Sequence, residues 1–165
     1  MTFRRALKHL FAPPWDLRSA FPPAALERIE ATVKASEQHH RGEVRFAVEG
    51  ALEFLPVLRG LTPRARALEV FSLLRVWDTE ENSGVLIYVQ FVDHDIEIVA
   101  DRGISARIAQ TEWEAICRGM EEAFRSQQYE EGVLAGISDV SALLAAQFPA
   151  HESNADELPN RPVVL

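Results

Sequence analysis

Acidic and amide side chains lie on either side of two strongly apolar segments of the sequence. Asp78 and Asn82 precede the segment 84–92, and Asp101 ends the segment 95–101. If these segments are antiparallel strands, the start of one and the end of the other meet at the same end of a sheet. Carboxylate and amide oxygens are the ligands that hard cations such as Ca²⁺ and Mg²⁺ prefer. The sequence therefore predicts a divalent-cation site, with Ca²⁺ or Mg²⁺ as the metal, formed by Asp78, Asn82 and Asp101.

A structural role is the alternative interpretation of the same residues. The acidic loop that contains Asp78 is typical of a solvated helix end, and Asp101 is placed to cap the turn before Gly103. Glu43, which begins another predicted strand, belongs to the same end of the sheet. The residues alone leave both interpretations open.

Other catalytic chemistry has little support in the residue pattern. Cys117 is the only cysteine, and it lies among apolar residues at helical spacing, which is typical of a buried structural thiol. Ser83 precedes a strand without a Gly-x-Ser-x-Gly elbow, and no Gly-rich phosphate loop precedes a helix. Phosphoryl chemistry would therefore depend on a metal held by Asp78 and Asp101.

Three segments are predicted to form one sheet. Residues 84–92 are almost continuously apolar, which is typical of a strand buried on both faces. Residues 95–101 alternate in part and follow after a very short turn, so these two strands are predicted to be antiparallel. Residues 43–49 alternate between apolar and polar, which places their strand towards the sheet edge. A helix separates 43–49 from 84–92, and this order predicts that the two strands are parallel.

Four amphipathic helices are predicted to cover the sheet, so the fold class is α/β. The first spans 24–38, and the second begins at Thr62, a capping hydroxyl followed by Pro in the first turn. The third begins with a capping box from Thr111 to Glu114, and the fourth spans 130–147. The stripe predicted to be buried on the second helix contains Leu68, Val70, Phe71, Leu74 and Trp77.

The two ends of the chain are set apart from residues 22–149, which form the predicted domain. Residues 1–21 are basic, and apolar residues recur at helical spacing from Phe3 to Phe11. One interpretation of this segment is a weak membrane-surface or partner helix. The other, which we favour, is a short helix docked on the domain. Residues 150–165 are polar and are predicted to be extended or disordered.

Composition excludes two classes of function. The 165 residues carry a net charge of −8, which argues against nucleic-acid binding because phosphate neutralisation needs a basic surface. The longest apolar run is too short for a transmembrane segment, and the first residues lack the pattern of a secretory signal. The protein is therefore expected in the cytoplasm.

Several segments together resemble the TPM domain family. The residues that carry the resemblance are Asn82 to Val89 and Ile98 to Ile104, supported by Gly42 to Glu49. That family, formerly a domain of unknown function, groups a thylakoid lumen protein of photosystem repair with bacterial relatives. The resemblance implies a Rossmann-like three-layer α/β/α sandwich with a mixed sheet. It also implies divalent-metal binding and, for some members, acid phosphatase activity.

The sequence departs from the family pattern at the predicted site. The family's acidic or Asn residue and the Gly before the central strand fall on Asn82 and Gly84, but Ser83 separates them and the usual Asp pair is absent. The turn after the third strand falls on Asp101 and Gly103. Family members often carry a signal peptide and a membrane helix, and neither is expected here.

These observations favour a soluble TPM-like domain that binds Ca²⁺ or Mg²⁺ without strong catalysis. One alternative is a metal-dependent phosphomonoesterase acting on a small phosphorylated substrate, so whether the protein is an enzyme stays open. Another alternative is a metal-free interaction module that docks on a membrane-associated protein partner.

Overall fold

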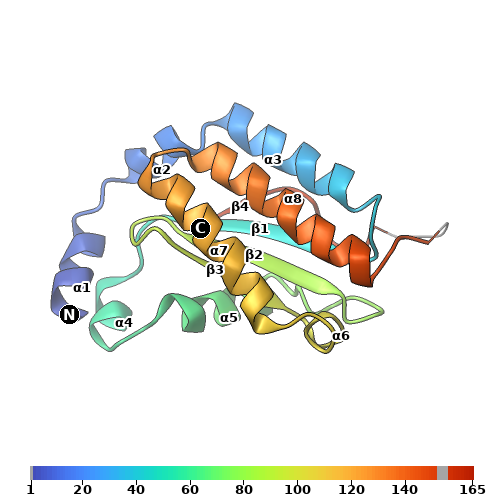
Figure 1. The fold of residues 1–165 in the computed structure, drawn as a ribbon. Coiled ribbons are helices and arrows are strands. Elements are labelled where there is room, and N and C mark those ends of the chain that lie inside the picture. Colours follow the sequence, from blue (N-terminus) through green and yellow to red (C-terminus); the bar gives the residue numbers. More distant parts are fainter. Residues whose placement is uncertain (1, 152–155) are drawn as a thin grey trace.

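An open, mixed β-sheet organises the fold. The computed structural model describes residues 2–151 and 156–165. Within these residues the sheet has four strands in the order β3-β2-β1-β4. β1 is parallel to β2 and β4, whereas β2 is antiparallel to β3 (Figure 1). The parallel and antiparallel pairs predicted from the sequence are both confirmed. The strands are Glu43–Glu49 (β1), Gly84–Gln90 (β2), Asp95–Ala100 (β3) and Val163–Val164 (β4).

Helices of very different length surround the sheet. The four amphipathic helices predicted from the sequence are α3, α5, α7 and α8, and α1 is the predicted N-terminal helix. The short helices α2, α4 and α6 were not predicted. The bounds are Thr2–Leu10 (α1), Pro14–Ala20 (α2), Pro23–Ser36 (α3), Phe54–Leu58 (α4), Pro63–Leu73 (α5), Arg102–Ser105 (α6), Gln110–Arg125 (α7) and Tyr129–Gln147 (α8).

Apolar cores lie on both faces of the sheet. On one face, α3, α7 and α8 pack over residues such as Phe46 and Ile87. On the other face, α5 packs over Ala47 and Leu86. Neighbours such as Phe46 and Ala47 lie in different cores because successive strand residues point to opposite faces. The resulting helix-sheet-helix layering agrees with an α/β fold (Figure 1), while its Rossmann-like character stays a prediction.

β1 is a central strand, so the prediction that it lies towards the edge is wrong. All of its residues are buried. The Arg45 guanidinium donates a hydrogen bond to the carbonyl of Pro159, and Arg66 donates to a Glu49 carboxylate oxygen at 2.8 Å. The C-terminal segment and α5 therefore cover these polar side chains. The alternation of apolar and polar residues along β1 had suggested that they face solvent.

The buried side of α5 differs from the prediction. Thr62 caps the helix as predicted, with its hydroxyl accepting a backbone N–H of the first turn at 3.1 Å. Leu68 and Trp77 were predicted to be buried, but they are 48% and 47% exposed. Leu68 lies off the stripe of α5 that meets the sheet, and Trp77 lies beyond the end of the helix at Leu73. That stripe contains Ala67, Val70, Phe71 and the partly buried Leu74.

The predicted capping box of α7 does not form. The helix begins at Gln110, one residue before Thr111, and Ala109 is its N-cap without a side-chain hydrogen bond. Thr111 is therefore already inside the first turn, where its backbone is helical and its hydroxyl is not in the capping position.

Both ends of the chain pack against the rest of the fold. α1 is docked, as favoured, but through the buried Ala6 and His9, while Phe3 and Leu10 are exposed. At the other end, Val163 and Val164 pair with β1, so this part of the C-terminal segment is an extended strand of the sheet. No helix among the described residues is both long enough and apolar enough to cross a membrane.

Candidate functional site

The two ends of the parallel strands carry different polar groups. At the amino end, where β1 and β2 begin, Glu43 is opposite Gly84. At the carboxyl end, where these strands finish, Glu49 is opposite Gln90. The predicted cation site belongs to the amino end, because β3 finishes there beside the start of β2.

The structure brings two of the predicted ligands together. The N–H of Asp101 donates to the carbonyl of Gly84 at 2.8 Å, and the N–H of Gly103 donates to the carbonyl of Asn82 at 3.1 Å. A Cβ at Gly103 would lie 2.6 Å from that Asn82 oxygen, so this close approach requires glycine. Asn82 has a φ of +53°, a left-handed conformation that asparagine tolerates.

Arginines engage part of the predicted ligand set. Arg75 forms an ion pair with Asp78 at 2.7 Å, and Arg102 Nε donates to Asn82 Oδ1 at 2.9 Å. Asp101 caps α6 through Oδ1, which accepts the N–H of Arg102 at 2.7 Å. Its Oδ2 is buried and accepts no hydrogen bond from the residues that the structure describes. Of the predicted ligands, Asp101 thus keeps one open acceptor, whereas Asp78 and Asn82 are paired with arginines.

A second group of acidic residues lies at the amino end and was not predicted as a site. Carboxylate oxygens of Glu37, Glu43 and Asp156 lie within 4.8 Å of one another, and no other such group was found in residues 2–151 and 156–165. Glu37 is the C-cap of α3, Glu43 begins β1, and Asp156 lies in the C-terminal segment. We call these three residues the acidic cluster.

Backbone N–H groups hold two members of the acidic cluster in place. Glu37 and Glu43 are 8% and 1% exposed, whereas Asp156 is exposed. Glu37 Oε1 accepts the N–H of Val44 at 2.8 Å. Glu43 Oε2 accepts two successive N–H groups of the C-terminal segment at 3.2 and 3.0 Å. The C-terminal segment is thus fastened to the start of β1 where the cluster forms.

Burial raises the pKa of both glutamates in the acidic cluster. Desolvation is the main cause for Glu37, whose pKa is raised to about 8 although the N–H of Val44 opposes the shift. The charges of Glu43 and Asp156 raise the pKa of Glu37 further. Desolvation likewise raises the pKa of Glu43. The cluster therefore retains a proton near neutral pH, and a hard cation would stabilise the fully ionised form.

Sequence reasoning placed Glu43 at this end of the sheet but missed its partners. Glu37 follows the last turn of a helix, where a glutamate is unremarkable. Asp156 lies in a segment that was predicted to be extended or disordered. No local spacing links the three residues, because the cluster depends on the return of the C-terminal segment to β1.

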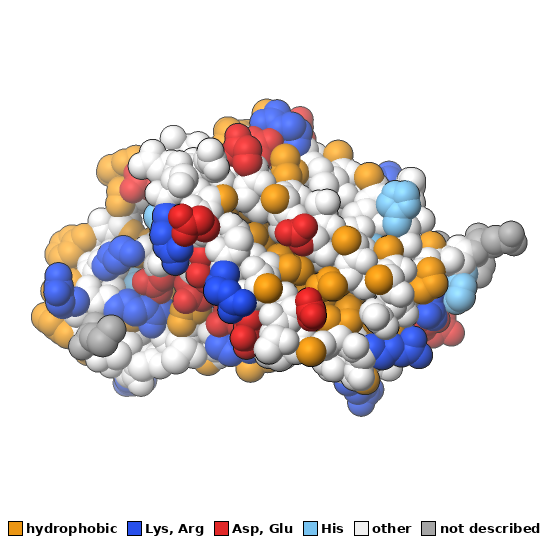
Figure 2. Space-filling model, in the orientation of Figure 1, with side chains coloured by type: hydrophobic (Ala, Val, Ile, Leu, Met, Phe, Trp, Pro, Cys, Tyr) orange, Lys and Arg blue, Asp and Glu red, His pale blue; other side chains and the backbone are white. Residues whose placement is uncertain are grey.

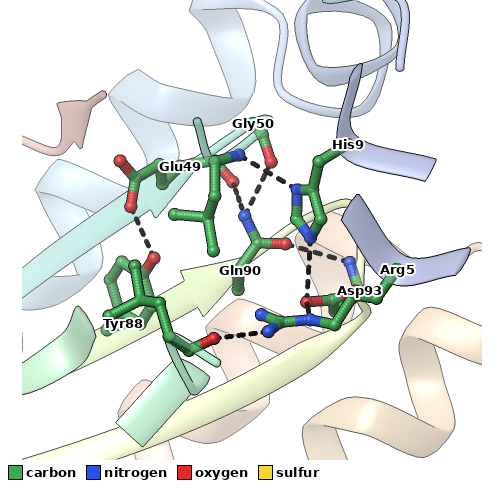
Figure 3. A network of polar contacts seen from close by, with 9 residues as sticks. Arg5, His9, Glu49, Gly50, Tyr88, Gln90 and Asp93 are labelled. Carbon is green, nitrogen blue, oxygen red and sulfur yellow. Dashed lines mark hydrogen bonds and ion pairs between the residues drawn. The ribbon is translucent and has the colours of Figure 1, made fainter. Parts of the chain in front are cut away.

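A buried polar network fastens α1 to the carboxyl end of the sheet (Figure 3). Asp93 Oδ2 accepts a hydrogen bond from Arg5 Nε at 2.7 Å and lies 3.1 Å from His9 Nε2. The N–H of Leu52 donates to His9 Nδ1 at 3.0 Å, which places the ring proton on Nε2. Burial lowers the pKa of His9 despite the neighbouring Asp93, in agreement with a neutral ring.

The same network extends across the ends of β1 and β2. The Gln90 amide donates to the carbonyl of Gly50 at 2.8 Å and accepts the N–H of Asp93 at 3.0 Å. The Tyr88 hydroxyl donates to Glu49 at 2.5 Å, and burial raises the pKa of Tyr88. These groups are hydrogen-bonded to one another, so their role at the carboxyl end is structural. The amino end is therefore the better candidate for ligand binding.

Comparison with known proteins decides the family. The profile of the TPM domain matches residues 16–143, which is most of the chain. The chain belongs to the TPM domain family. This confirms the resemblance that the strand motifs carry.

A solved structure shares the fold of this TPM domain. It is the NMR structure of the BA42 protein from the psychrophilic bacterium Bizionia argentinensis, with 27% sequence identity and a TM-score of 0.76. The similarity covers 86% of this chain and 93% of BA42. No curated protein matches the sequence.

Proposed function

We propose that this TPM domain binds a divalent cation, Ca²⁺ or Mg²⁺, at the amino end of its sheet. The acidic cluster carries the proposal, because three carboxylates converge there within 4.8 Å. Oxygen ligands suit both ions, and water completes the shell that three side chains leave open. Desolvation is the main cause of the raised pKa of Glu37, and a bound cation would offset the smaller contribution from the neighbouring carboxylates.

The predicted set Asp78, Asn82 and Asp101 is a second location for the same function. The buried Oδ2 of Asp101 supports it. The arginines at Asp78 and Asn82 oppose it, since a cation would compete with two positive charges already in place. The acidic cluster is therefore our first choice, and single substitutions distinguish the two locations.

Thermal unfolding in EDTA and then in Ca²⁺ or Mg²⁺ tests the proposal. A ligand at about one hundred times its dissociation constant stabilises the folded state by roughly 2.7 kcal/mol. For a domain of this size we expect a rise in Tm of about 5–10 °C. Asp156→Asn should remove most of this rise, because it neutralises the exposed member of the acidic cluster.

Two further variants locate the cation. Asp101→Asn should keep the rise if the acidic cluster is the site and lose it if the predicted set is the site. Asp139→Asn is the matched control, because Asp139 is exposed on α8 and belongs to neither set. If neither ion moves the wild-type melting curve, the proposal fails and a metal-free interaction module becomes the better explanation.

Binding without strong catalysis is the form of the proposal that the geometry supports. Glu37 and Glu43 are buried, so a phosphate ester would reach a metal in the acidic cluster only from the side of Asp156. We expect little hydrolysis of a generic phosphate ester by the cation-loaded protein. Metal-dependent turnover at an ordinary enzyme rate of about 1–1000 per second, abolished by Asp156→Asn, would establish the phosphomonoesterase instead.

A further inference from the structure

The N-terminal helix α1 leaves the large apolar side chains of Phe3 and Leu10 in solvent. Arg5 and His9 attach it to Asp93 at 2.7 and 3.1 Å and also bond to the backbone of residues 61 and 52, and the small side chain of Ala6 is buried beneath it. Phe3 is 59% exposed. An amphipathic helix of a globular domain ordinarily buries its apolar face. Here polar groups hold the helix, and the apolar residues are left for another contact.

The exposed apolar surface continues beyond α1. α4 packs against α1 and exposes Leu55 and Leu58, and α2 exposes Trp15. Figure 2 shows hydrophobic side chains beside Lys and Arg side chains at the end of the molecule where α1 and α4 lie. Exposed apolar surface of this kind marks an interaction site. The apolar patch, as we call it, comprises Phe3 (59% exposed), Leu10 (55%), Phe11 (76%), Trp15 (68%), Leu55 (57%) and Leu58 (39%).

Basic side chains accompany the apolar patch although the whole chain is acidic. Arg4, Lys8 and Arg18 are exposed on α1 and α2. Asp16 is the only acidic residue in the first 21 positions, whereas the whole chain has a net charge of −8. Exposed Phe and Leu with Lys and Arg on one short helix are typical of helices that lie in an anionic membrane interface. Trp is also enriched at that interface.

We propose that the apolar patch docks this TPM domain on an anionic lipid bilayer, with α1 lying in the interface. A second copy of the chain suits the patch poorly, because a symmetric contact would bring the basic residues of both copies together. The acidic cluster lies at the amino end of the sheet, whereas α1 is fastened to the carboxyl end. The proposed orientation therefore places the exposed basic residues of α1 and α2 against the membrane and the acidic cluster away from it.

Sedimentation with vesicles tests this proposal in EDTA, which keeps any bound cation out of the measurement. We expect the protein to bind vesicles that contain phosphatidylglycerol, to bind pure phosphatidylcholine vesicles much less, and to dissociate at high salt. Phe3→Ser with Phe11→Ser should lower the partition coefficient by about tenfold or more. The fluorescence emission of Trp15 should shift to shorter wavelength on binding, and Trp15→Phe should remove that shift.

An apolar surface elsewhere provides the matched control. Leu68 and Leu73 are 48% and 64% exposed on α5, away from the patch. Leu68→Ser with Leu73→Ser should leave vesicle binding unchanged, and melting curves should show that both double variants remain folded. The proposal is wrong if phosphatidylglycerol vesicles bind no protein, or if the two double variants lose binding equally. It is also wrong if the Phe variants abolish only a concentration-dependent dimer, measured by analytical ultracentrifugation.

Discussion

Glu37 makes the stability of the folded protein depend on pH. Its pKa is raised from 4.5 to about 8 by burial, so the folded chain retains a proton that the unfolded chain releases. The stabilising effect of this proton is complete below pH 4.5 and is lost as pH rises to about 8. Glu37→Gln stays neutral and keeps an oxygen that can accept the N–H of Val44.

We predict that Glu37→Gln gains stability relative to wild type as pH rises through that interval. Because one bound proton is involved, the gain in the free energy of unfolding is at most about 1.4 kcal/mol for each pH unit. Denaturant titrations in EDTA at the two ends of the interval measure it. A difference between the two proteins that does not change with pH would contradict the assigned protonation of Glu37.

Two glycines should respond oppositely to the same substitution. A Cβ on Gly84 would lie 1.8 Å from the carbonyl oxygen of Val76, which is a backbone atom and not the end of a flexible side chain. We predict that Gly84→Ala destabilises the protein by about 3 kcal/mol or more. Gly119 lies in α7 with no atom near its Cβ position, so Gly119→Ala should stabilise by up to about 1 kcal/mol. Urea midpoints compare the two, and equal shifts would disprove the packing at Gly84.

At the scale of elements, Asp93 accepts hydrogen bonds from two side chains of α1, beside the contacts of Arg5 with Leu61 and of His9 with Leu52. Asp93→Ala removes the acceptor that Arg5 Nε and His9 Nε2 share, while the contacts of Arg5 with Leu61 and of His9 with Leu52 remain. Unpaired buried donors cost about 1–3 kcal/mol each, and we expect α1 to detach before the sheet unfolds. Hydrogen exchange should show faster exchange of α1 amides while β2 amides remain protected. Asp16→Ala, at an exposed position on α2, is the control, and equal effects of the two variants would exclude this role of Asp93.

The elements predicted correctly from the sequence are those whose structure depends on residues close to one another in the chain. β2 was recognisable because every residue from Gly84 to Gln90 is buried, and Thr62 marks the start of α5 by a local capping contact. The contacts of α1 were not predicted and the edge position of β1 was predicted wrongly, both for one physical reason. In both cases polar side chains are buried against distant partners, as Arg45 is against Pro159, and apolar periodicity contains no information about such partners.

At the scale of the whole molecule, the acidic cluster and the exposed basic residues of α1 and α2 lie at different ends of the sheet. The acidic cluster lies at the amino end of the sheet, and the basic residues of α1 and α2 lie at the carboxyl end. The candidate site was only partly predictable at this scale, because topology placed Glu43 and Asp101 at one end but not Asp156. That last position depends on a contact between Glu43 and residue 158, which are 115 residues apart in the sequence.

The return of the C-terminal segment to β1 also has a consequence for the order of folding. Forming a contact between residues 115 positions apart costs a large loop-closure entropy. Such contacts should therefore form after the local α7-α8 hairpin. We predict that Leu158→Ala, which truncates a buried side chain, accelerates unfolding and leaves the refolding rate nearly unchanged. Val133→Ala, in the α7-α8 hairpin, should slow refolding instead. Chevron plots of the two variants measure both rates, and slower refolding of Leu158→Ala would place the C-terminal segment in the folding nucleus.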